Sequence, residues 1–171
     1  MKTPAGKGKK YSTTYKKKIV TTDSYLTKSG QGAAVCEGCQ AVYRNKRWYV
    51  GPELVKAGTV AVKVVCPACH KIRDNFPGGI VTLSGDYVLP HKMALLKLVK
   101  NEEDRARGFN PLERVMAVKE NGHGSVIITT TNEKLAQRLG RAIKKAFHGV
   151  VKYHWSHDNK LVRVDWVKEV A

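Results

Sequence analysis

The stretches VCEGC (35–39) and CPACHK (66–71) contain all four cysteines of the chain, in two Cys-x-x-Cys pairs separated by 26 residues. Two residues between cysteines let both thiolates of a pair reach one ion, and four thiolates complete the tetrahedral shell that Zn²⁺ prefers in structural sites. The long gap between the pairs leaves room for two strands. The pattern therefore predicts one structural zinc ion on Cys36, Cys39, Cys66 and Cys69.

The alternative for these cysteines is two disulfide or redox pairs. No hydrophobic signal segment lies near Met1, so the protein is expected in the cytoplasm, where stable disulfides are rare. A redox Cys-x-x-Cys motif would occur once, at a helix N-terminus. His70 follows Cys69 and is a possible substitute ligand, but the complete cysteine set favours a solvent-facing or supporting role for it.

Working outward from the cysteines, residues 35–85 are predicted to form a zinc ribbon. AVYRNKRWYV (41–50) is rich in aromatic and β-branched residues and predicts a strand. GTVAVKVVC (58–66) predicts a second strand that leads into the second cysteine pair, and GIVTLSG (79–85) a short third one. Because such a module has a small core, zinc binding is expected to supply much of its folding free energy.

The flanking segments divide into a tail, a helix and a second domain. Residues 1–34 are Lys-, Gly-, Ser- and Thr-rich and predict a disordered basic tail. Residues 86–110 predict a connecting helix, with the helix itself over 90–107. Residues 111–171 predict a small ββαββ domain. The fold class is therefore α+β, and the expected sheet is four-stranded and mostly antiparallel, with helices on one face.

The ββαββ prediction rests on periodicity and turn signals. Strands are expected at 113–120, 124–131, 150–156 and 161–168, and a helix at 132–149. Asn121-Gly122 and Asp158-Asn159 mark the two hairpin turns. Thr130 and Glu133 offer a capping box at the start of the helix.

The charge of the chain is strongly unbalanced. Lys and Arg number 31 against 14 Asp and Glu, which gives a formal net charge of +17. Such self-repulsion is tolerated most simply when the partner is a polyanion. The excess falls in the tail, the cysteine module and the last 61 residues, and the connecting helix is nearly balanced. No stretch approaches the roughly 20 apolar residues of a membrane-spanning helix, so no membrane partner is expected.

Three clusters of cations are candidates for nucleic-acid contacts. Each has a plainer interpretation as a solubility tail, a ribbon surface or a solvated helix face, and the aromatic residues of the ribbon are expected to belong more often to its core. The tail cluster is Lys7, Lys9, Lys10, Lys16, Lys17 and Lys18. The ribbon cluster is Arg44, Lys46 and Arg47 with Trp48. The helix cluster is Lys134, Arg138, Arg141, Lys144 and Lys145.

No catalytic motif is present. The polar residues Asp74, Asp86 and His91 are scattered, and the acidic run NEED (101–104) is expected to be solvated. Phosphate-binding, nucleophile-elbow, metalloprotease and dinucleotide signatures are all missing from the sequence. The sequence therefore predicts a binding protein with no small-molecule substrate.

Several segments in order carry a resemblance. From about Cys36 to Trp166 the chain resembles a family of small bacterial zinc-ribbon proteins, through CEGCQAVYRNKRWYV, CPACHKIRDNFPGGIVTLSGDYVLPHK, NEEDRA, NPLERVMAV and ITTTNEKLAQRLGRAIKKAF. It is more weakly similar to the archaeal and eukaryotic adaptor of large-ribosomal-subunit export, which has more cysteine pairs. The resemblance implies a ribosome-associated role in assembly, quality control or dormancy, with ribosomal RNA and ribosomal proteins as partners.

Two binding functions remain in view from the sequence, and a third function, an enzyme acting on nucleic acid, would need a cluster of carboxylates or an open metal position. The first is an RNA-binding zinc ribbon that associates with the ribosome. The second is a DNA-binding transcriptional regulator, since zinc ribbons and basic helices also serve that role. Regulators usually bind as symmetric dimers, and no dimer seam or helix-turn-helix pattern is evident in the sequence.

Overall fold

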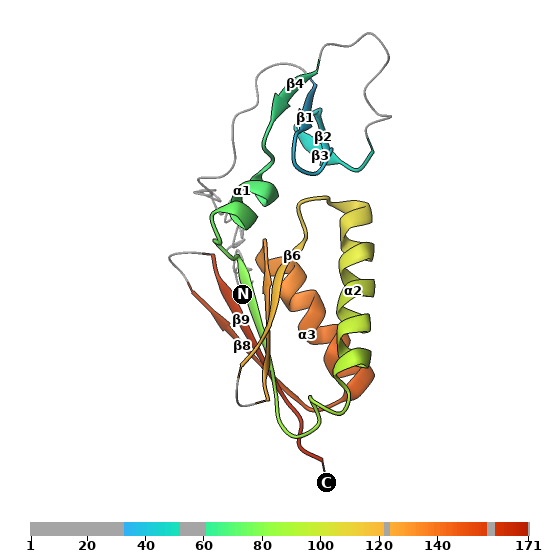
Figure 1. The fold of residues 1–171 in the computed structure, drawn as a ribbon, viewed down its shortest axis with the longest axis vertical. Coiled ribbons are helices and arrows are strands. Elements are labelled where there is room, and N and C mark those ends of the chain that lie inside the picture. The colour runs from blue at the N-terminus through green and yellow to red at the C-terminus, as the bar shows by residue number, and fades with distance from the viewer. Residues whose placement is uncertain (1–32, 52–60, 122–123, 157–159, 171) are drawn as a thin grey trace, which may run out of the picture.

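The computed structural model shows two parts stacked along the long axis of the molecule, a small ribbon that holds the cysteines and a larger α+β body (Figure 1). Over the described residues the fold is α+β, with three helices and two mixed sheets, as the predicted class requires. Most of the predicted tail lies outside the description, so its disorder stays a prediction. The structure describes residues 33–51, 61–121, 124–156 and 160–170.

The ribbon is built on a sheet of four short strands among the residues described. They are β1 (Ala34–Cys36), β2 (Val42–Arg44), β3 (Arg47–Tyr49) and β4 (Val62–Val64). Their order is β3-β2-β1-β4, and β4 runs parallel to β1 while the other pairs are antiparallel. The two predicted ribbon strands therefore form in part.

The segment 41–50 was predicted as one strand, and this prediction is wrong. It folds as the β2–β3 hairpin, whose turn residues Asn45 and Lys46 have φ angles of 51° and 63°. Two successive left-handed residues make a tight turn whose twist matches antiparallel strands. Asn tolerates this region well, but a Lys in second place is a far weaker turn signal than Gly. The strand-like residues on either side concealed the turn.

Helix α1 (Pro67–Arg73) begins inside the second cysteine pair and was not predicted. Cys66 is its N-cap residue, and the Cys66 sulfur accepts a hydrogen bond from the backbone N–H of Cys69 at 3.4 Å. Pro67 occupies the first turn, where a missing N–H costs nothing because that group has no intrahelical partner. Pro67 was the signal that could have revealed the helix.

The body is organised around a five-stranded sheet. The order of its strands is β6-β7-β5-β9-β8. All four strands predicted after residue 111 form. The strands are β5 (Gly79–Ser84), β6 (Val115–Glu120), β7 (Val126–Thr130), β8 (Val150–Trp155) and β9 (Val162–Val167).

The expectation of a four-stranded, mostly antiparallel sheet is corrected by strand β5. This strand was assigned to the ribbon, but it lies at the centre of the body, antiparallel to β7 and parallel to β9, so the sheet is mixed. Val81 and Leu83 point from it into the core and are fully buried. In the body, β5 forms hydrogen bonds with a strand on each side, and its apolar face packs against the core. A three-stranded ribbon would not have offered β5 both a second neighbouring strand and a core.

Helices α2 (Lys92–Phe109) and α3 (Glu133–Phe147) cover one face of this sheet, as predicted (Figure 1). The N-cap of α3 is Asn132, whose side chain accepts the N–H of Leu135 at 3.0 Å. The predicted capping box is therefore wrong. The Thr130 hydroxyl, which would accept a backbone N–H in such a box, instead donates to the Asn132 carbonyl at 2.8 Å.

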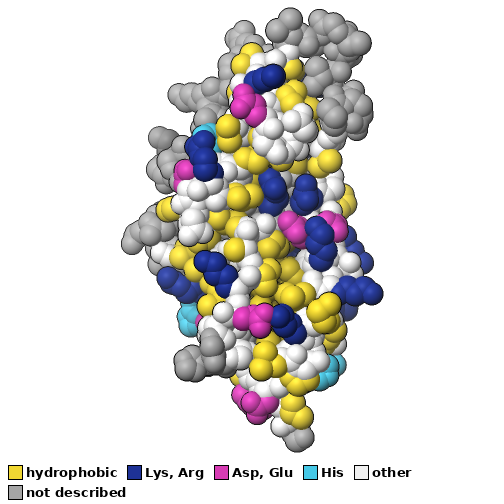
Figure 2. Space-filling view, viewed as in Figure 1, with side chains coloured by type: hydrophobic (Ala, Val, Ile, Leu, Met, Phe, Trp, Pro, Cys, Tyr) yellow, Lys and Arg dark blue, Asp and Glu magenta, His cyan; other side chains and the backbone are white. Residues whose placement is uncertain are grey.

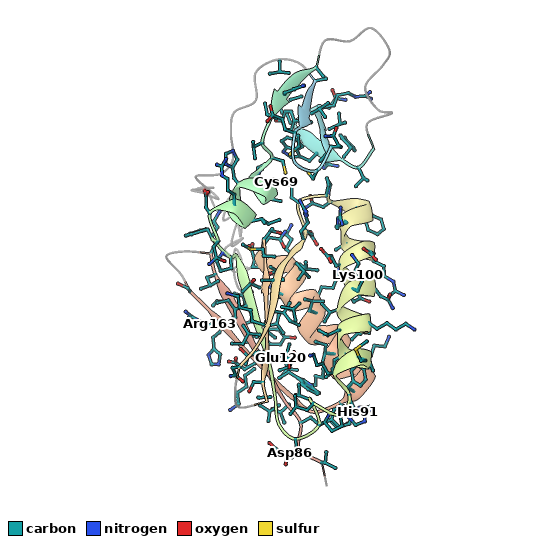
Figure 3. The ribbon with its side chains drawn as sticks, viewed as in Figure 1. Cys69, Asp86, His91, Lys100, Glu120 and Arg163 are labelled. Carbon is teal, nitrogen blue, oxygen red and sulfur yellow. The ribbon has the colours of Figure 1, made fainter. Side chains whose placement is uncertain are left out.

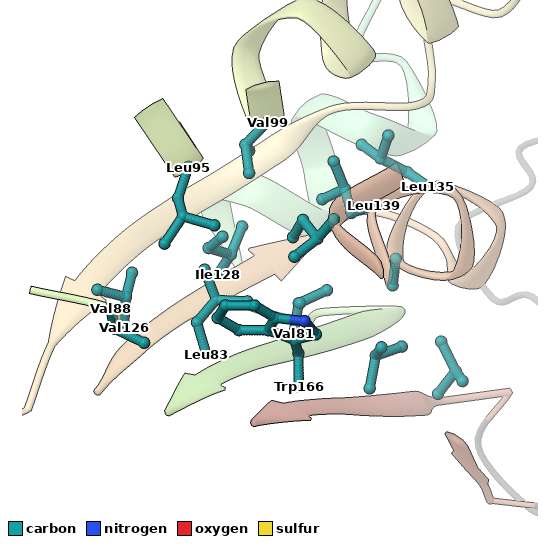
Figure 4. Packing of buried hydrophobic residues seen from close by; sticks show 14 of the residues in the cluster. Val81, Leu83, Val88, Leu95, Val99, Val126, Ile128, Leu135, Leu139 and Trp166 are labelled. Atoms are coloured by element: carbon teal, nitrogen blue, oxygen red, sulfur yellow. The ribbon is translucent and has the colours of Figure 1, made fainter. Parts of the chain in front are cut away.

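The core of the body lies between the helices and the sheet, around Trp166 (Figure 4). The Trp166 indole N–H donates to the His148 carbonyl at 2.6 Å, which satisfies the one polar atom of this buried ring. Helix α3 approaches the sheet closely at Gly140. A Cβ atom there would lie 2.6 Å from Cγ1 of Val164 and 3.0 Å from the Tyr153 hydroxyl.

Glu103 departs from the expectation of a solvated acidic run. Its side chain is buried, and one carboxylate oxygen accepts the backbone N–H of Val115 at 2.9 Å. Lys100 lies 3.5 Å from the other oxygen. Glu103 thereby joins α2 to the first residue of β6, while Asp104 beside it is exposed.

Candidate functional site

The four cysteines come together at the base of the ribbon. Cys36 ends β1, Cys39 follows in the adjoining turn, and Cys66 and Cys69 lie at the start of α1. Their four sulfur atoms all lie within 4.8 Å of one another, and Cys39 and Cys66 are 3.6 Å apart. Figure 3 places Cys69 at the junction between the ribbon and the body.

The geometry of the four sulfurs fits one tetrahedral metal ion. Bonds of about 2.3 Å to a central ion place tetrahedral sulfurs about 3.8 Å apart, close to the 3.6 Å between the Cys39 and Cys66 sulfurs. Backbone N–H groups also face the sulfurs, since Cys66 donates to the Cys36 sulfur at 3.2 Å. At Gly38, a Cβ atom would lie 3.1 Å from the Cys69 sulfur, so glycine lets the first turn approach the second. The cluster can hold a metal ion.

Proton affinities in the cluster are set by crowding. The hydrogen bond from Cys66 lowers the pKa of Cys39 to about 5, and the same hydrogen bond, together with burial, raises the pKa of Cys66. Burial raises the pKa of Cys69 to about 11. Without a cation the site thus favours one thiolate with protonated neighbours, because several negative sulfurs a few Å apart repel. A divalent cation would remove that repulsion and bind all four as thiolates.

His70 does not join the ligand cluster among the described residues. Its Nδ1 atom lies 2.8 Å from an Arg73 guanidinium nitrogen. The expectation that the cysteine set is complete without His70 agrees with this arrangement.

Two residues of the body contact the cysteines and were missed from the sequence. The Arg114 guanidinium donates to the Cys69 sulfur at 3.3 Å, and Leu112 packs against the cysteine core. The backbone of Arg114 is held in turn by Thr131, whose hydroxyl accepts the backbone N–H of Arg114 at 2.9 Å. Arg114 lies 45 residues beyond Cys69, so no local signal could have indicated this contact.

The predicted ribbon cations lie on the β2–β3 hairpin. Arg44, Lys46 and Arg47 are exposed, whereas Trp48 is half-buried against the cysteine core, with its ring 5.3 Å from that of Tyr43. Trp48 therefore contributes to the ribbon core while remaining partly exposed. The predicted tail cations, Lys7, Lys9, Lys10, Lys16, Lys17 and Lys18, lie outside the described residues.

A cleft of about 680 Å³ lies where the hairpin faces the body. It brings together residues of two predicted contact clusters that are distant in sequence, Lys46, Arg47 and Trp48 from the ribbon and Lys134 from α3. Phe109, the last residue of α2, also lines it and is 88% exposed. Figure 2 shows Lys and Arg side chains on one face at this level, between the ribbon and the body.

The cations of α3 continue from the cleft along the outer face of the helix. Lys134, Arg138, Arg141 and Lys145 are spaced by four, three and four residues, which places them in one stripe about 16 Å long, opposite the buried Leu139 and Ile143. We call these four residues the basic stripe.

The remaining residues of α3 fix the surroundings of the basic stripe. Lys144 lies off it, and Glu133 in the first turn is the one acidic residue of the helix. Burial raises the pKa of Tyr153 on β8, and the positive charge of Arg141 opposes that rise.

Comparison with protein-family models, with curated proteins and with solved structures finds no match to this chain. The class of protein is therefore defined by its own fold and site, an α+β protein with a four-cysteine cluster that can hold a metal ion. Within the part of the chain that is described, no helix combines the length and apolarity needed to cross a bilayer.

Proposed function

We propose that this protein is a zinc-binding, RNA-binding protein that associates with ribosomal RNA. Zinc is the metal whose chemistry suits four thiolates in a tetrahedron, and a shell with no open position assigns it a structural role. The ion would hold the ribbon hairpin in place beside the body. The chain's own residues would make the RNA contacts.

The observation that carries the proposal is the convergence of two basic clusters on one cleft. Lys46 and Arg47 reach it from the ribbon, and Lys134 reaches it from α3 with the rest of the basic stripe behind it. Glu113 is the one acidic residue among those that line this cleft in the described structure, and it is 9% exposed and bonded to Asn110. Cations gathered from distant segments with so little neutralisation suit a phosphate backbone.

The ribosome enters the proposal only through the resemblance read from the sequence, of residues 36–166 to the bacterial zinc-ribbon family and, more weakly, of the ribbon and its following α+β module to part of the export adaptor. Assembly, quality control and dormancy would all use the same docking chemistry. Phosphate contacts would hold the protein in register, and a few contacts to bases would fix its position.

Sedimentation tests the ribosome association. Cell lysate is run on sucrose gradients at about 50 mM and at several hundred mM salt, and the protein is followed by immunoblot. Co-migration with ribosomal particles at low salt and release at high salt is expected, because phosphate contacts weaken steeply with salt. Retention on chromosomal DNA instead would support the regulator alternative.

Charge-matched variants test the RNA surface. The triple variant Lys46→Gln, Arg47→Gln, Lys134→Gln removes three cleft cations. The control Lys97→Gln, Lys119→Gln, Lys152→Gln removes three exposed cations elsewhere. With purified ribosomal RNA, the cleft variant should reduce the slope of log K against log salt by about 2–3, and the control by much less. Equal loss in both variants would contradict a located binding surface.

The metal is tested by Cys36→Ser, since Cys36 is fully buried in the cluster. This variant is expected to lose bound zinc, measured by elemental analysis, and the native fold of the ribbon. The near-ultraviolet signal of Trp166 in the separate core of the body should persist. A variant that kept zinc and native thermal stability would refute the structural role of the metal.

A further inference from the structure

We infer that the cleft between the ribbon hairpin and the α2 and α3 ends binds an unpaired nucleotide of single-stranded RNA, with the strand continuing along the basic stripe. This inference rests on the proposed function and names the form of RNA that the site takes. The inference distinguishes single-stranded from double-stranded RNA as the ligand, a distinction that the net charge of the chain cannot make.

The walls of the cleft suit a flat, partly apolar ligand. Tyr43 and Trp48 supply tilted aromatic rings 5.3 Å apart on the ribbon side. Phe109 supplies a ring on the side of the body. Unpaired bases stack on such rings, and stacking tolerates any base because every base has a π-face. In a duplex the base faces are already stacked on one another and are not available.

The exposure of Phe109 is itself informative. At 88% exposed, Phe109 contributes almost nothing to the core, and the surface beside it is open, since a side chain at Gly108 would meet no atom within 4 Å beyond its own helix. An isolated exposed apolar residue is ordinary. Phe109, however, lines a cleft that also contains two further aromatic rings and three cations. A nucleotide would give this phenyl ring a base to stack on and would give the cations a phosphate.

The polar groups of the cleft separate base from phosphate. Glu113 lies in the cleft with a carboxylate bonded to Asn110 at 3.4 Å, and a carboxylate repels phosphate but accepts hydrogen bonds from base amino groups. Lys46, Arg47 and Lys134 are exposed and suit phosphates. A base inside the cleft can donate to the Glu113 carboxylate while its phosphates face the three cations, so both kinds of polar group have a partner.

The basic stripe gives the strand a direction away from the cleft. Lys134 belongs both to the cleft and to the stripe, and Arg138, Arg141 and Lys145 follow it along α3. Each phosphate contact with a single strand contributes about 0.7 to the salt slope, against about 0.9 for a B-form duplex. The stripe and the cleft cations Lys46 and Arg47 therefore set the salt dependence of binding, and the rings set the salt-independent part of the affinity.

The test uses the full chain with zinc and three fluorescein-labelled 12-nucleotide probes of one sequence, a single RNA strand, its blunt RNA duplex and the corresponding DNA strand. Anisotropy gives Kd for each. Phe109→Ala should weaken binding of the RNA strand about 5- to 100-fold, leave its salt slope unchanged and leave duplex affinity unchanged. Met93→Ala is the matched control, an 80% exposed apolar residue of the same helix, and should have no effect.

The outcomes separate the inference from the proposed function. Unchanged strand affinity in Phe109→Ala, or wild-type protein that prefers the duplex, would overturn the inference while RNA binding stood. Tighter binding of the DNA strand would overturn the assignment to RNA. Wild-type protein that bound none of the probes and no ribosomal RNA at about 50 mM salt would overturn the proposed function and the inference with it. Arg138→Gln with Arg141→Gln should lower the strand's salt slope by about 1.4, and an unchanged slope would remove the stripe from the path.

Discussion

At the residue scale, single side chains join segments that the sequence keeps apart. Arg114 touches the Cys69 sulfur, and Glu103 accepts the first N–H of β6. Neither residue differs from its neighbours in any way that the sequence alone would reveal. Arg114 supplies a donor to a sulfur, and Glu103 supplies an acceptor to a backbone N–H. Both contacts matter because polar groups removed from water need a hydrogen-bond partner.

Glu103→Ala is expected to destabilise the body by about 1–3 kcal/mol, because the Val115 N–H loses its partner in a partly buried position. Denaturant unfolding followed by circular dichroism measures the change. Asp104→Ala is the control, since Asp104 is exposed and pairs with Lys100 at the surface. That pair is worth about 0.5 kcal/mol or less. Equal effects in the two variants would show that the Glu103 hydrogen bond is not special.

The cysteine thiols predict how zinc affinity follows pH. The raised pKa values of Cys66 and Cys69 mean that both keep their protons at pH 7 until metal arrives, so binding should release at least two protons. Apparent affinity should then rise about 100-fold per pH unit near neutrality. Cys39, with a pKa of about 5, is already a thiolate at pH 7, so the metal competes with protons for this sulfur only in acid.

Calorimetry in buffers of different ionisation enthalpy counts these protons, and an affinity independent of pH would contradict the assignment. While a metal-free ribbon is still folded, the raised pKa of Cys69 favours the protonated thiol. Its contribution to the stability of the fold is present below the usual pKa near 9 and is lost as the pH climbs toward 11.

At the scale of elements, close packing of α3 on the sheet depends on Gly140. Gly140→Ala would place a methyl group 2.6 Å from Val164 and against the Tyr153 hydroxyl, so one of the partners must move. Despite the better helix propensity of alanine, we expect a loss of about 1–3 kcal/mol, measured as a lower Tm. Ala142→Gly, a half-buried position of the same helix, is the control for propensity alone. A Tm raised by Gly140→Ala would show that the sheet yields easily.

At the scale of the whole molecule, the ribbon and the body have separate cores of very different kind. Among the described residues, the ribbon core is Cys36, Ala41, Cys66 and Ala68 with a few flanking residues, whereas the body has a cluster of fifteen buried residues that includes Trp166. A core that is half cysteine supplies little hydrophobic stabilisation once its metal is removed.

Chelation of the metal should therefore unfold the ribbon and spare the body. Hydrogen exchange with and without a strong chelator is expected to show lost protection in β1 and β2 and retained protection in β5 and β9. Leu112 and Arg114 contact the cysteines from the body, so exchange should also rise near residue 114. Global unfolding on chelation would contradict the separation of the two cores.

The sequence by itself determined the α+β class, the four cysteines as one cluster, the ββαββ order and both long helices. These follow from local rules, because cysteine spacing, period-two and period-3.6 patterns and turn residues act within a few positions of one another. It could also identify which cations are candidates for contact. The sequence could not show which of these cations lie close together in the folded protein.

Only the tertiary structure decided the placement of β5, the Arg114 contact and the cleft. GIVTLSG carries the pattern of a strand but nothing that names its neighbours, and its pairing with β9 joins residues more than 80 positions apart. Lys46 and Lys134 likewise share a cleft through the docking of the ribbon on the body. Local sequence specifies which faces are apolar, whereas partners for those faces are chosen by packing of the whole chain, whose contacts are non-local.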